Sequence, residues 1–372
     1  MRTNSIDIKS FGIILILSLY SSCTNRFAQN IPYEVPSNTI NAKIDSIVGS
    51  KMNLYNIPGL AICVVKDATV LHSKGYGTKN IKTNAPVLTS SVFHVASVSK
   101  LFTAIAIMQL VDQGKLDLDT RMDQVNPGFK NREVGNITIR QLLNHTSGLP
   151  DVSNYQWSNG NENEDSLEKY ILGTSLKPKT TPGTTYNYSN LGYDLLGYTV
   201  QRVSGTSFEK YALNKVLIPG GMTSSDFRYF NIPESLRTTP HTKSWITGNV
   251  KVQTPYPYTR EHAPSSTLNA SVSDLGTWMI SFMQTLNDSH HYYHTMLQPS
   301  TPLSPNMGLG FQLSDLDGYP TVGHYGGDKG FRSYLMMIPQ QKIGLVLLAN
   351  ADYNEDFRQE ILHEIARMLL QE

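Results

Sequence analysis

The chain has 372 residues, of which 40% are hydrophobic and 16% are charged, and its 31 basic side chains nearly balance its 30 acidic ones. A formal charge of +1 provides no basic surface for nucleic acid, and the apolar content is too high for a disordered chain. Two cysteines can form neither a disulfide framework nor a thiolate zinc site. These totals predict a folded protein that binds no nucleic acid.

The N-terminus has the pattern of a secretory signal. Arg2 and Lys9 precede an apolar run at 11–20 (FGIILILSLY), which is too short to span a bilayer as a mature helix. Small residues directly before Cys23 resemble a bacterial lipobox, which implies cleavage there and a lipid anchor on the sulfur. The alternative is an ordinary signal that is cleaved later, after Ala28. In either case we expect an exported protein, periplasmic or attached to the membrane only through this anchor.

This pattern divides the chain into a signal peptide at 1–22, a tether at 23–38 and one domain at 39–372. The tether carries two prolines and no apolar period. The domain is predicted to begin with a surface helix over about 42–52. It ends with apolar residues at helical spacing, which predict a helix over about 354–370.

Strand patterns lie at both ends of the domain. The runs at 60–65 and 69–73 are joined by a tight turn, and those at 331–338 and 343–350 by a short polar link. Helical patterns dominate from about 95 to 290. We therefore expect an α+β fold, in which an antiparallel sheet built from both chain ends is flanked by helices and interrupted by a mainly helical insertion.

An apolar helix predicted over 97–113 carries the first candidate catalytic pair. Ser97 lies in its first turn and Lys100 follows three residues later, so both side chains project from one face. Burial disfavours the ammonium form of a lysine, which enables it to accept a proton from a neighbouring hydroxyl. S-x-x-K alone is a weak signal, because Ser97 can instead cap the helix while Lys100 reaches solvent.

Two further clusters accompany this pair. Tyr188 and Asn190 belong to a Y-S-N run directly before a predicted helix, and the run GHYGG at 323–327 is predicted to open a late strand. The order S-x-x-K, Y-x-N and H-x-G resembles the serine β-lactamase and penicillin-binding protein superfamily, specifically its class C-like branch. The resemblance extends over about residues 40–370 and implies the fold of serine β-lactamases and DD-peptidases.

Two longer runs, ITIRQLLNHTSGLP and STLNASVSDLGTWM, are also typical of that family. Thr138 with Gln141 and Ser271 with Asp274 predict capping boxes at the starts of helices within these runs. We expect both runs to stabilise the fold and to supply no catalytic side chain.

The resemblance implies a role for each matching side chain. Ser97 matches the acylated nucleophile, Lys100 its general-base partner and Tyr188 the tyrosine that shuttles protons. Asn190 matches the asparagine that hydrogen-bonds the lysine and the substrate. The resemblance leaves open which of Lys100 and Tyr188 holds the proton at each step.

The resemblance also assigns the late strand. His324 and Gly326 take the places of lysine and glycine in the family's Lys-Thr-Gly triplet, which faces the nucleophile. The N–H groups of Ser97 and Gly327 would form the oxyanion hole. His324 is mostly neutral near pH 7 at its reference pKa, unlike the lysine that helps β-lactamases to hold the drug's carboxylate.

The implied reaction is two-step acyl transfer by a serine hydrolase that needs no cofactor. We expect small-molecule or peptidoglycan-like substrates with an ester bond or an amide bond of the D-amino-acid peptide type. A class C-like β-lactamase and a penicillin-binding cell-wall sensor without turnover are the alternatives. His290, His291 and His294 are interpreted as a surface feature and not as a metal site, because no carboxylate or cysteine pattern accompanies them.

Overall fold

The computed structural model describes residues 38–157, 162–354 and 357–371. The predicted signal peptide, Cys23 and all but the last residue of the tether lie outside these ranges. Over the described ranges, no helix has the length and apolar character needed to cross a membrane.

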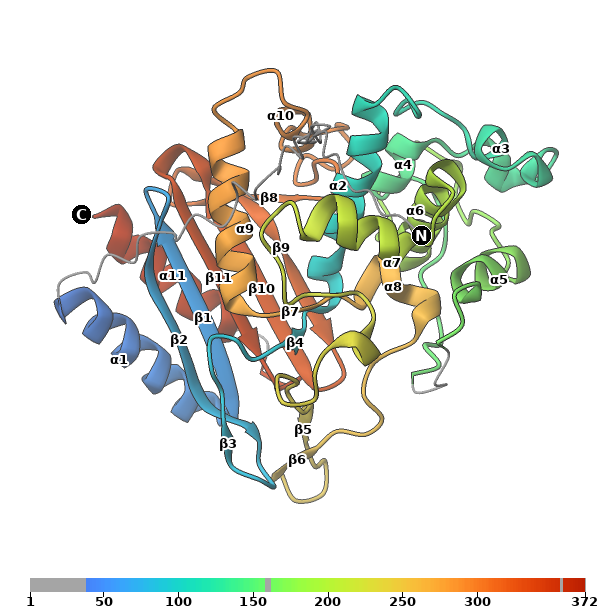
Figure 1. Ribbon diagram of the computed structural model, residues 1–372. Helices are drawn as coiled ribbons and strands as arrows, with labels where there is room; N and C mark the ends of the chain where they lie inside the picture. Colours follow the sequence, from blue (N-terminus) through green and yellow to red (C-terminus); the bar gives the residue numbers. More distant parts are fainter. Residues whose placement is uncertain (1–37, 158–161, 355–356, 372) are drawn as a thin grey trace, which may run out of the picture. The chain divides into compact units, whose positions relative to one another are not determined.

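The centre of the structure is a seven-stranded antiparallel sheet in the order β3-β2-β1-β11-β10-β9-β8 (Figure 1). Its strands are β1 (Gly59–Lys66), β2 (Thr69–Asn80), β3 (Ala85–Pro86), β8 (Gln312–Leu316), β9 (Tyr319–Asp328), β10 (Phe331–Ile338) and β11 (Ile343–Ala349). β1 pairs with β11, with Cys63 opposite Val346, so the two ends of the domain meet in mid-sheet. The predicted α+β class, with a sheet from both chain ends, is confirmed.

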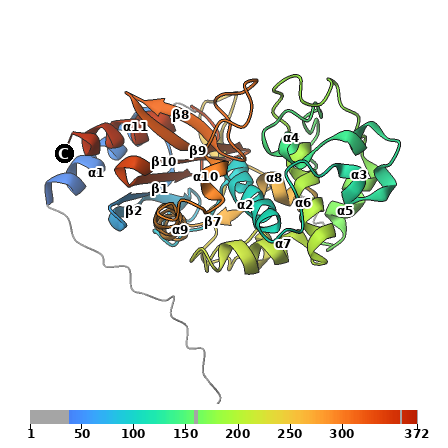
Figure 2. The same ribbon diagram turned by 90° about the horizontal axis from the view of Figure 1, so that it is seen from above.

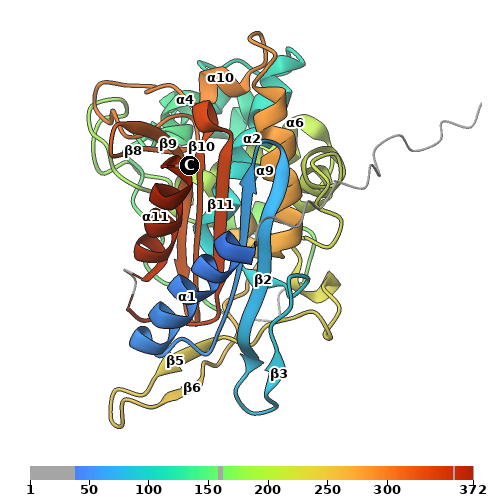
Figure 3. The ribbon, with the colours of Figure 1, turned by 90° about the vertical axis from the view of Figure 1, so that its left-hand side faces the viewer.

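Side chains of β1 alternate between two hydrophobic layers, as the period of a strand requires. Leu60, Ile62 and Val64 face one layer, which includes residues of α1 (Asn38–Tyr55) and α11 (Phe357–Leu370). Figures 2 and 3 show these two helices together on one side of the sheet.

The opposite layer contains α9 (Val272–Thr285) and the helical insertion. A Cβ atom on Gly276 would lie 2.5 Å from Cys63 Sγ, so α9 rests closely on β1 at this point. Burial raises the pKa of Cys63 to about 12. This thiol therefore packs the core and is not reactive.

The insertion is mainly helical, as expected. Its helices are α2 (Ser99–Asp112), α3 (Met122–Val125), α4 (Ile139–Leu143), α5 (Ser166–Gly173), α6 (Asn190–Ser204), α7 (Phe208–Tyr211), α8 (Ala263–Ser266), α9 and α10 (Tyr293–Met296). Two short strand pairs interrupt them, β4 (Phe93–His94) with β7 (Asn269–Ala270) and β5 (His241–Lys243) with β6 (Val250–Val252).

One of the two predicted capping boxes is complete. At the start of α4 the Thr138 and Gln141 side chains each bond the other's backbone N–H. At the start of α9 Ser271 accepts the N–H of Asp274, but the Asp274 carboxylate accepts from Ser224 N–H and Ser225 Oγ instead. The box predicted at α9 is therefore wrong in its Asp274 half, because this carboxylate accepts hydrogen bonds from the loop at residues 224–225 and not from Ser271 N–H.

Candidate active site

Ser97 lies in a 3-10 turn, η1 (Ala96–Val98), that leads into α2, and not in the first turn of an α-helix as predicted. Ala96 has a φ of +49°, which is unfavourable for a residue with a Cβ atom. Ser333 Oγ on β10 donates to the Val95 carbonyl at 2.7 Å and so fixes this turn to the sheet. Ser97 remains partly exposed between buried neighbours.

Lys100 is completely buried, and its Nζ donates to three acceptors. These are Ser97 Oγ at 3.0 Å, Asn190 Oδ1 at 2.5 Å and the Ser265 carbonyl at 2.7 Å. Burial lowers the pKa of Lys100 to about 7, against the opposing effect of three carboxylates. The opposing carboxylates belong to Asp194, Asp151 and Asp328. Near neutral pH this lysine therefore exists both as amine and as ammonium.

A second side chain contacts the nucleophile: the Tyr188 hydroxyl donates to Ser97 Oγ at 3.0 Å. Its ring lies 5.0 Å from Lys100 Nζ. Burial raises the pKa of Tyr188 well above its ordinary value, so this hydroxyl keeps its proton near neutral pH.

His145 packs against the ring of Tyr188, a contact that the sequence did not reveal. The two rings stack with centroids 4.3 Å apart, and Ser189 N–H donates to His145 Nδ1 at 3.1 Å. Burial holds the pKa of His145 well below its usual range, so it is a neutral ring. His145 lies in the N-H-T-S-G run that was interpreted as structural, and nothing in that run separates this histidine from its neighbours.

Asn190 is the first residue of α6, where Ser189 caps the helix by accepting Gly192 N–H. While its Oδ1 accepts from Lys100, its backbone N–H and Nδ2 both donate to the Asp151 carboxylate, at 2.8 and 3.3 Å. Asp151 therefore fixes which way the amide faces. The sequence did not identify Asp151, because this contact joins a loop to a distant helix.

β9 approaches the nucleophile turn at Gly326. A Cβ atom on this residue would lie 2.2 Å from the Val95 carbonyl and 3.3 Å from Ser97 N, so only glycine permits this contact. β8 pairs with β9 no further than Gly323, and Tyr325 N–H donates instead to Gln312 Oε1.

Gly327 N–H faces the same free edge of β9 as Tyr325 N–H, since alternate residues of an antiparallel strand share one direction. The strand contacts the nucleophile turn at Gly326, so its free edge lies next to that turn. The N–H groups of Ser97 and Gly327 are thus the two candidate donors of the oxyanion hole.

His324 is buried and neutral. Burial, with a smaller effect of the Lys100 charge, lowers its pKa to about 3. Its Nδ1 lies 2.5 Å from the Tyr325 carbonyl, which assigns the ring proton to Nδ1, and its buried Nε2 meets no partner among the described residues. His324 therefore presents an acceptor and not a cation.

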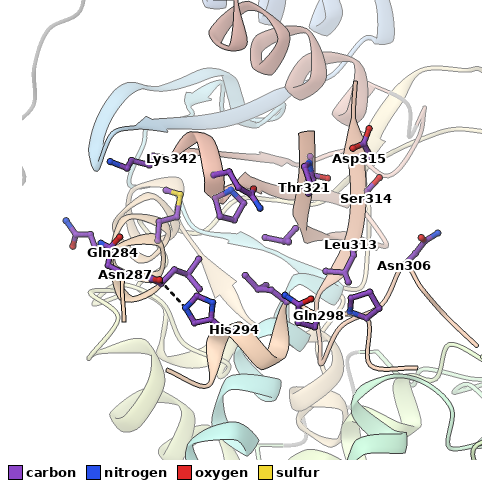
Figure 4. Close-up of a pocket in the computed structure, with 18 of the residues that line it drawn as sticks. Gln284, Asn287, His294, Gln298, Asn306, Leu313, Ser314, Asp315, Thr321 and Lys342 are labelled. Atoms are coloured by element: carbon purple, nitrogen blue, oxygen red, sulfur yellow. Dashed lines mark hydrogen bonds between the residues drawn. The ribbon is translucent and has the colours of Figure 1, made fainter. Parts of the chain in front are cut away.

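A large pocket of about 970 Å³ lies elsewhere, between α9, α10, β8 and the beginning of β9 (Figure 4). We call this pocket the groove. Pro320, Thr321 and Val322 of β9 line it, whereas none of the predicted catalytic or oxyanion residues does. His294 also lines it, and its Nε2 donates to the Leu286 carbonyl at 3.1 Å. Over the described ranges, no group of three or more histidine, cysteine or acidic side chains could hold a metal ion.

Comparison with known proteins identifies the family of the chain. A family model described as Beta-lactamase matches residues 44–368. Protein flp of Staphylococcus aureus (strain MRSA252) is 31% identical over 325 residues, which are 84% of this chain and 64% of that protein. The chain thus spans less than two thirds of the length of that relative.

Two of the solved structures illustrate the shared fold. The octameric penicillin-binding protein homologue from Pyrococcus abyssi has a TM-score of 0.74 at 26% identity, covering 89% of this chain and 77% of its own. D-amino acid amidase from Ochrobactrum anthropi SV3, complexed with L-phenylalanine amide, has a TM-score of 0.75 at 18% identity, covering 90% and 98%. The family match supports serine-hydrolase chemistry in general. With its family model matched over most of its length, this chain belongs to the β-lactamase family.

Proposed function

We propose that the protein is a serine hydrolase that forms a covalent acyl-enzyme on Ser97. One observation carries the proposal: Ser97 Oγ lies 3.0 Å from both Lys100 Nζ and the Tyr188 hydroxyl. The pKa of Lys100, about 7, makes a neutral amine available, while Tyr188 keeps its proton. The nucleophile thus has a base and an acid within hydrogen-bond reach.

Acylation begins when the Lys100 amine takes the Ser97 proton and Oγ bonds to the substrate's carbonyl carbon. The carbonyl electrons move to its oxygen, which the N–H groups of Ser97 and Gly327 stabilise. Collapse of this intermediate breaks the bond to the leaving group, and Tyr188 gives the departing oxygen or nitrogen its proton. The proton on Lys100 then restores Tyr188.

Deacylation repeats these steps with water. A water molecule loses a proton to the Lys100 and Tyr188 pair as its oxygen attacks the acyl carbon. The second intermediate collapses by releasing Ser97 Oγ, which recovers a proton. The products are a carboxylic acid and the alcohol or amine released earlier.

His324 supports an ester or an amide of the D-amino-acid peptide type as substrate. Its ring is neutral near pH 7, so it does not neutralise a substrate carboxylate. The fold shared with a D-amino acid amidase agrees with such substrates. We also propose small molecules or peptidoglycan-like peptides as the physiological partners.

A class C-like β-lactamase is the second candidate, favoured by the match to the family model. A penicillin-binding protein that is acylated without turnover is the third, favoured by the likeness to a penicillin-binding protein homologue. Both share the acylation step with the first proposal and differ in what is attacked and in how fast water releases it.

Parallel assays separate the three. We expect turnover of p-nitrophenyl acyl esters or D-alanine p-nitroanilide to exceed that of a chromogenic cephalosporin. Fast cephalosporin turnover without esterase or amidase activity would establish the β-lactamase instead. A burst of one product per enzyme with no further release would establish the third candidate.

We further propose that the chain is exported and anchored by a lipid on Cys23, on the pattern of its first residues. Mass spectrometry of the mature protein from a bacterial host tests this. The expected N-terminal peptide begins at a diacylglyceryl-modified Cys23, and an unmodified peptide that begins after Ala28 contradicts the anchor.

A further inference from the structure

A buried carboxylate and imidazole pair lies beside the site and has no part in the proposed chemistry. Asp194, one turn after Asn190 on α6, is completely buried, and its Oδ2 lies 2.6 Å from His262 Nδ1. His262 ends the 3-10 turn η6 (Arg260–His262) and is only 1% exposed. Desolvating a charged or polar pair costs free energy, and apolar side chains of similar volume would fill this space at less cost.

The pair is connected to Lys100 through the segment 262–266. Ser265 Oγ donates to the His262 carbonyl at 3.2 Å, and the Ser265 carbonyl accepts from Lys100 Nζ at 2.7 Å. Because α8 begins directly after His262, the position of this histidine fixes where the Ser265 carbonyl lies.

Two helices hold this segment in the same way. On α6, Asp194 binds His262 and Gly197 contacts Pro264 so closely that a Cβ atom would lie 2.0 Å from the proline ring. On α2, three residues after Lys100, Thr103 Oγ1 donates to the Pro264 carbonyl at 2.6 Å. Residues three apart share one helix face, so each helix contacts the segment at two points.

The imidazole ring of His262 also anchors the loop that contains Asp151. Tyr155 and Tyr170 meet this ring edge to face, with centroids 4.7 and 4.6 Å away, and Trp157 stacks on Tyr155 at 4.5 Å. The loop leads back to Asp151, whose carboxylate orients Asn190. The His262 residue therefore contacts both the segment that binds Lys100 and the loop that binds Asn190.

We propose that the Asp194 and His262 pair is a positioning element of the active site. It places the Ser265 carbonyl on Lys100 and the Asp151 carboxylate on Asn190, and the negative charge of Asp194 favours the protonated form of Lys100. The catalytic roles of Lys100 and Asn190 rest on the proposed function, but the placement of Lys100 and its titration do not.

Several groups face Lys100 and influence its titration. The carboxylates of Asp194 on α6, Asp151 on its loop and Asp328 on β9 raise its pKa, and burial opposes them. The neutral rings near it are those of His145, His324, Tyr188 and Tyr193. Among these three carboxylates, only Asp194 is completely buried, so removing its charge should change the pKa of Lys100 the most.

The test is an NMR titration of 13C-lysine-labelled protein, with Lys100 assigned through Lys100→Arg. Asp194→Asn keeps the shape of the side chain and an oxygen that accepts from His262 Nδ1, but it removes the charge. We expect the Lys100 midpoint to fall by about half a pH unit. Asp226→Asn is the matched control, because Asp226 is a buried carboxylate paired with Arg228 that does not act on Lys100, and it should leave the midpoint unchanged.

His262→Asn tests the positional part, since its amide can still donate to Asp194 while the aromatic contacts are lost. We expect the rate of Ser97 acylation to fall about tenfold with little change in KM and an unchanged fold by circular dichroism. A Lys100 midpoint that is the same in folded Asp194→Asn as in the wild type would overturn the proposal. So would wild-type acylation by folded His262→Asn. Failure of the wild type to be acylated at all would refute the proposed function, and the NMR midpoint would still decide this inference.

Discussion

The two halves of β9 border two different regions. Near its start, Pro320 and Val322 line the wide groove, whose charged residues, such as Lys342, are exposed to water. Four residues later the same strand borders a site where Lys100 is completely buried and bonded on three sides. The candidate catalytic groups thus lie where a lysine is buried, and not in the groove.

The physical reason is solvation. Water stabilises an exposed ammonium, which then holds its proton at neutral pH and cannot act as a base. Burial removes that stabilisation from Lys100 and brings its pKa to about 7. A lysine in the groove and a lysine at the site therefore make the clearest comparison.

The largest effect is expected from Lys100→Met compared with Lys342→Met. The first change removes the base, and acylation should slow about 10³-fold. The second removes an exposed cation from the groove and should leave the rate unchanged. Single-turnover acylation by a p-nitrophenyl ester measures both, and equal losses in the two variants would abolish the distinction between the regions.

Tyr188→Phe should lower the acylation rate about 10²-fold, because it removes the proton donor to the leaving group while keeping the ring. Tyr186→Phe is the matched control. Tyr186 is 41% exposed and contacts the supporting His145 only through its ring, so its hydroxyl should not matter. Unchanged acylation and turnover in Tyr188→Phe would show that the tyrosine is not the relay.

Gly326→Ala should slow acylation about 30-fold, because the new Cβ would collide with the Val95 carbonyl and move β9 away from the nucleophile. Gly173→Ala at the end of α5 meets no atom within 4 Å and should have no effect. Stopped-flow acylation, with melting curves for both variants, checks the difference. A fast, folded Gly326→Ala enzyme would contradict the close approach of this strand.

One pH unit below the pKa of Lys100, the pH profile should show the smallest but most specific effect. Lys100 must be neutral to act, and its pKa is about 7, so kcat/KM should fall about tenfold per unit below that pH. Above it the rate should stay level, because burial raises the pKa of Tyr188 well above its ordinary value. A descending limb between about pH 8 and pH 10 would contradict this assignment of acid and base.

Much of the fold could be predicted because its strands are apolar runs near both chain ends. The second half of β2 was missed: the run was predicted to stop at residue 73, but the strand continues to Asn80. Lys74, Gly75 and Gly77 interrupt the apolar pattern there, and hydrogen bonding to β1 maintains the strand where the side chains give no signal.

The spacing of S-x-x-K correctly predicted that Ser97 and Lys100 meet, although it placed Ser97 in an α-helix. A 3-10 turn and an α-helix bring residues three apart into similar proximity, so the period cannot tell them apart. The Ser265 carbonyl could not be predicted at all. It is a backbone atom, 165 positions from Lys100, and any residue type supplies the same oxygen.

In the proposed mechanism Ser97 is a nucleophile activated by its buried neighbours. Labelling with a fluorophosphonate, in which Ser97 Oγ bonds to phosphorus and fluoride departs, tests this role. Intact mass and peptide mapping should show one adduct on Ser97 in the wild type and none in Ser97→Ala. Absence of the adduct from the folded wild type, or an equal adduct on Ser97→Ala, would show that Ser97 is not the nucleophile.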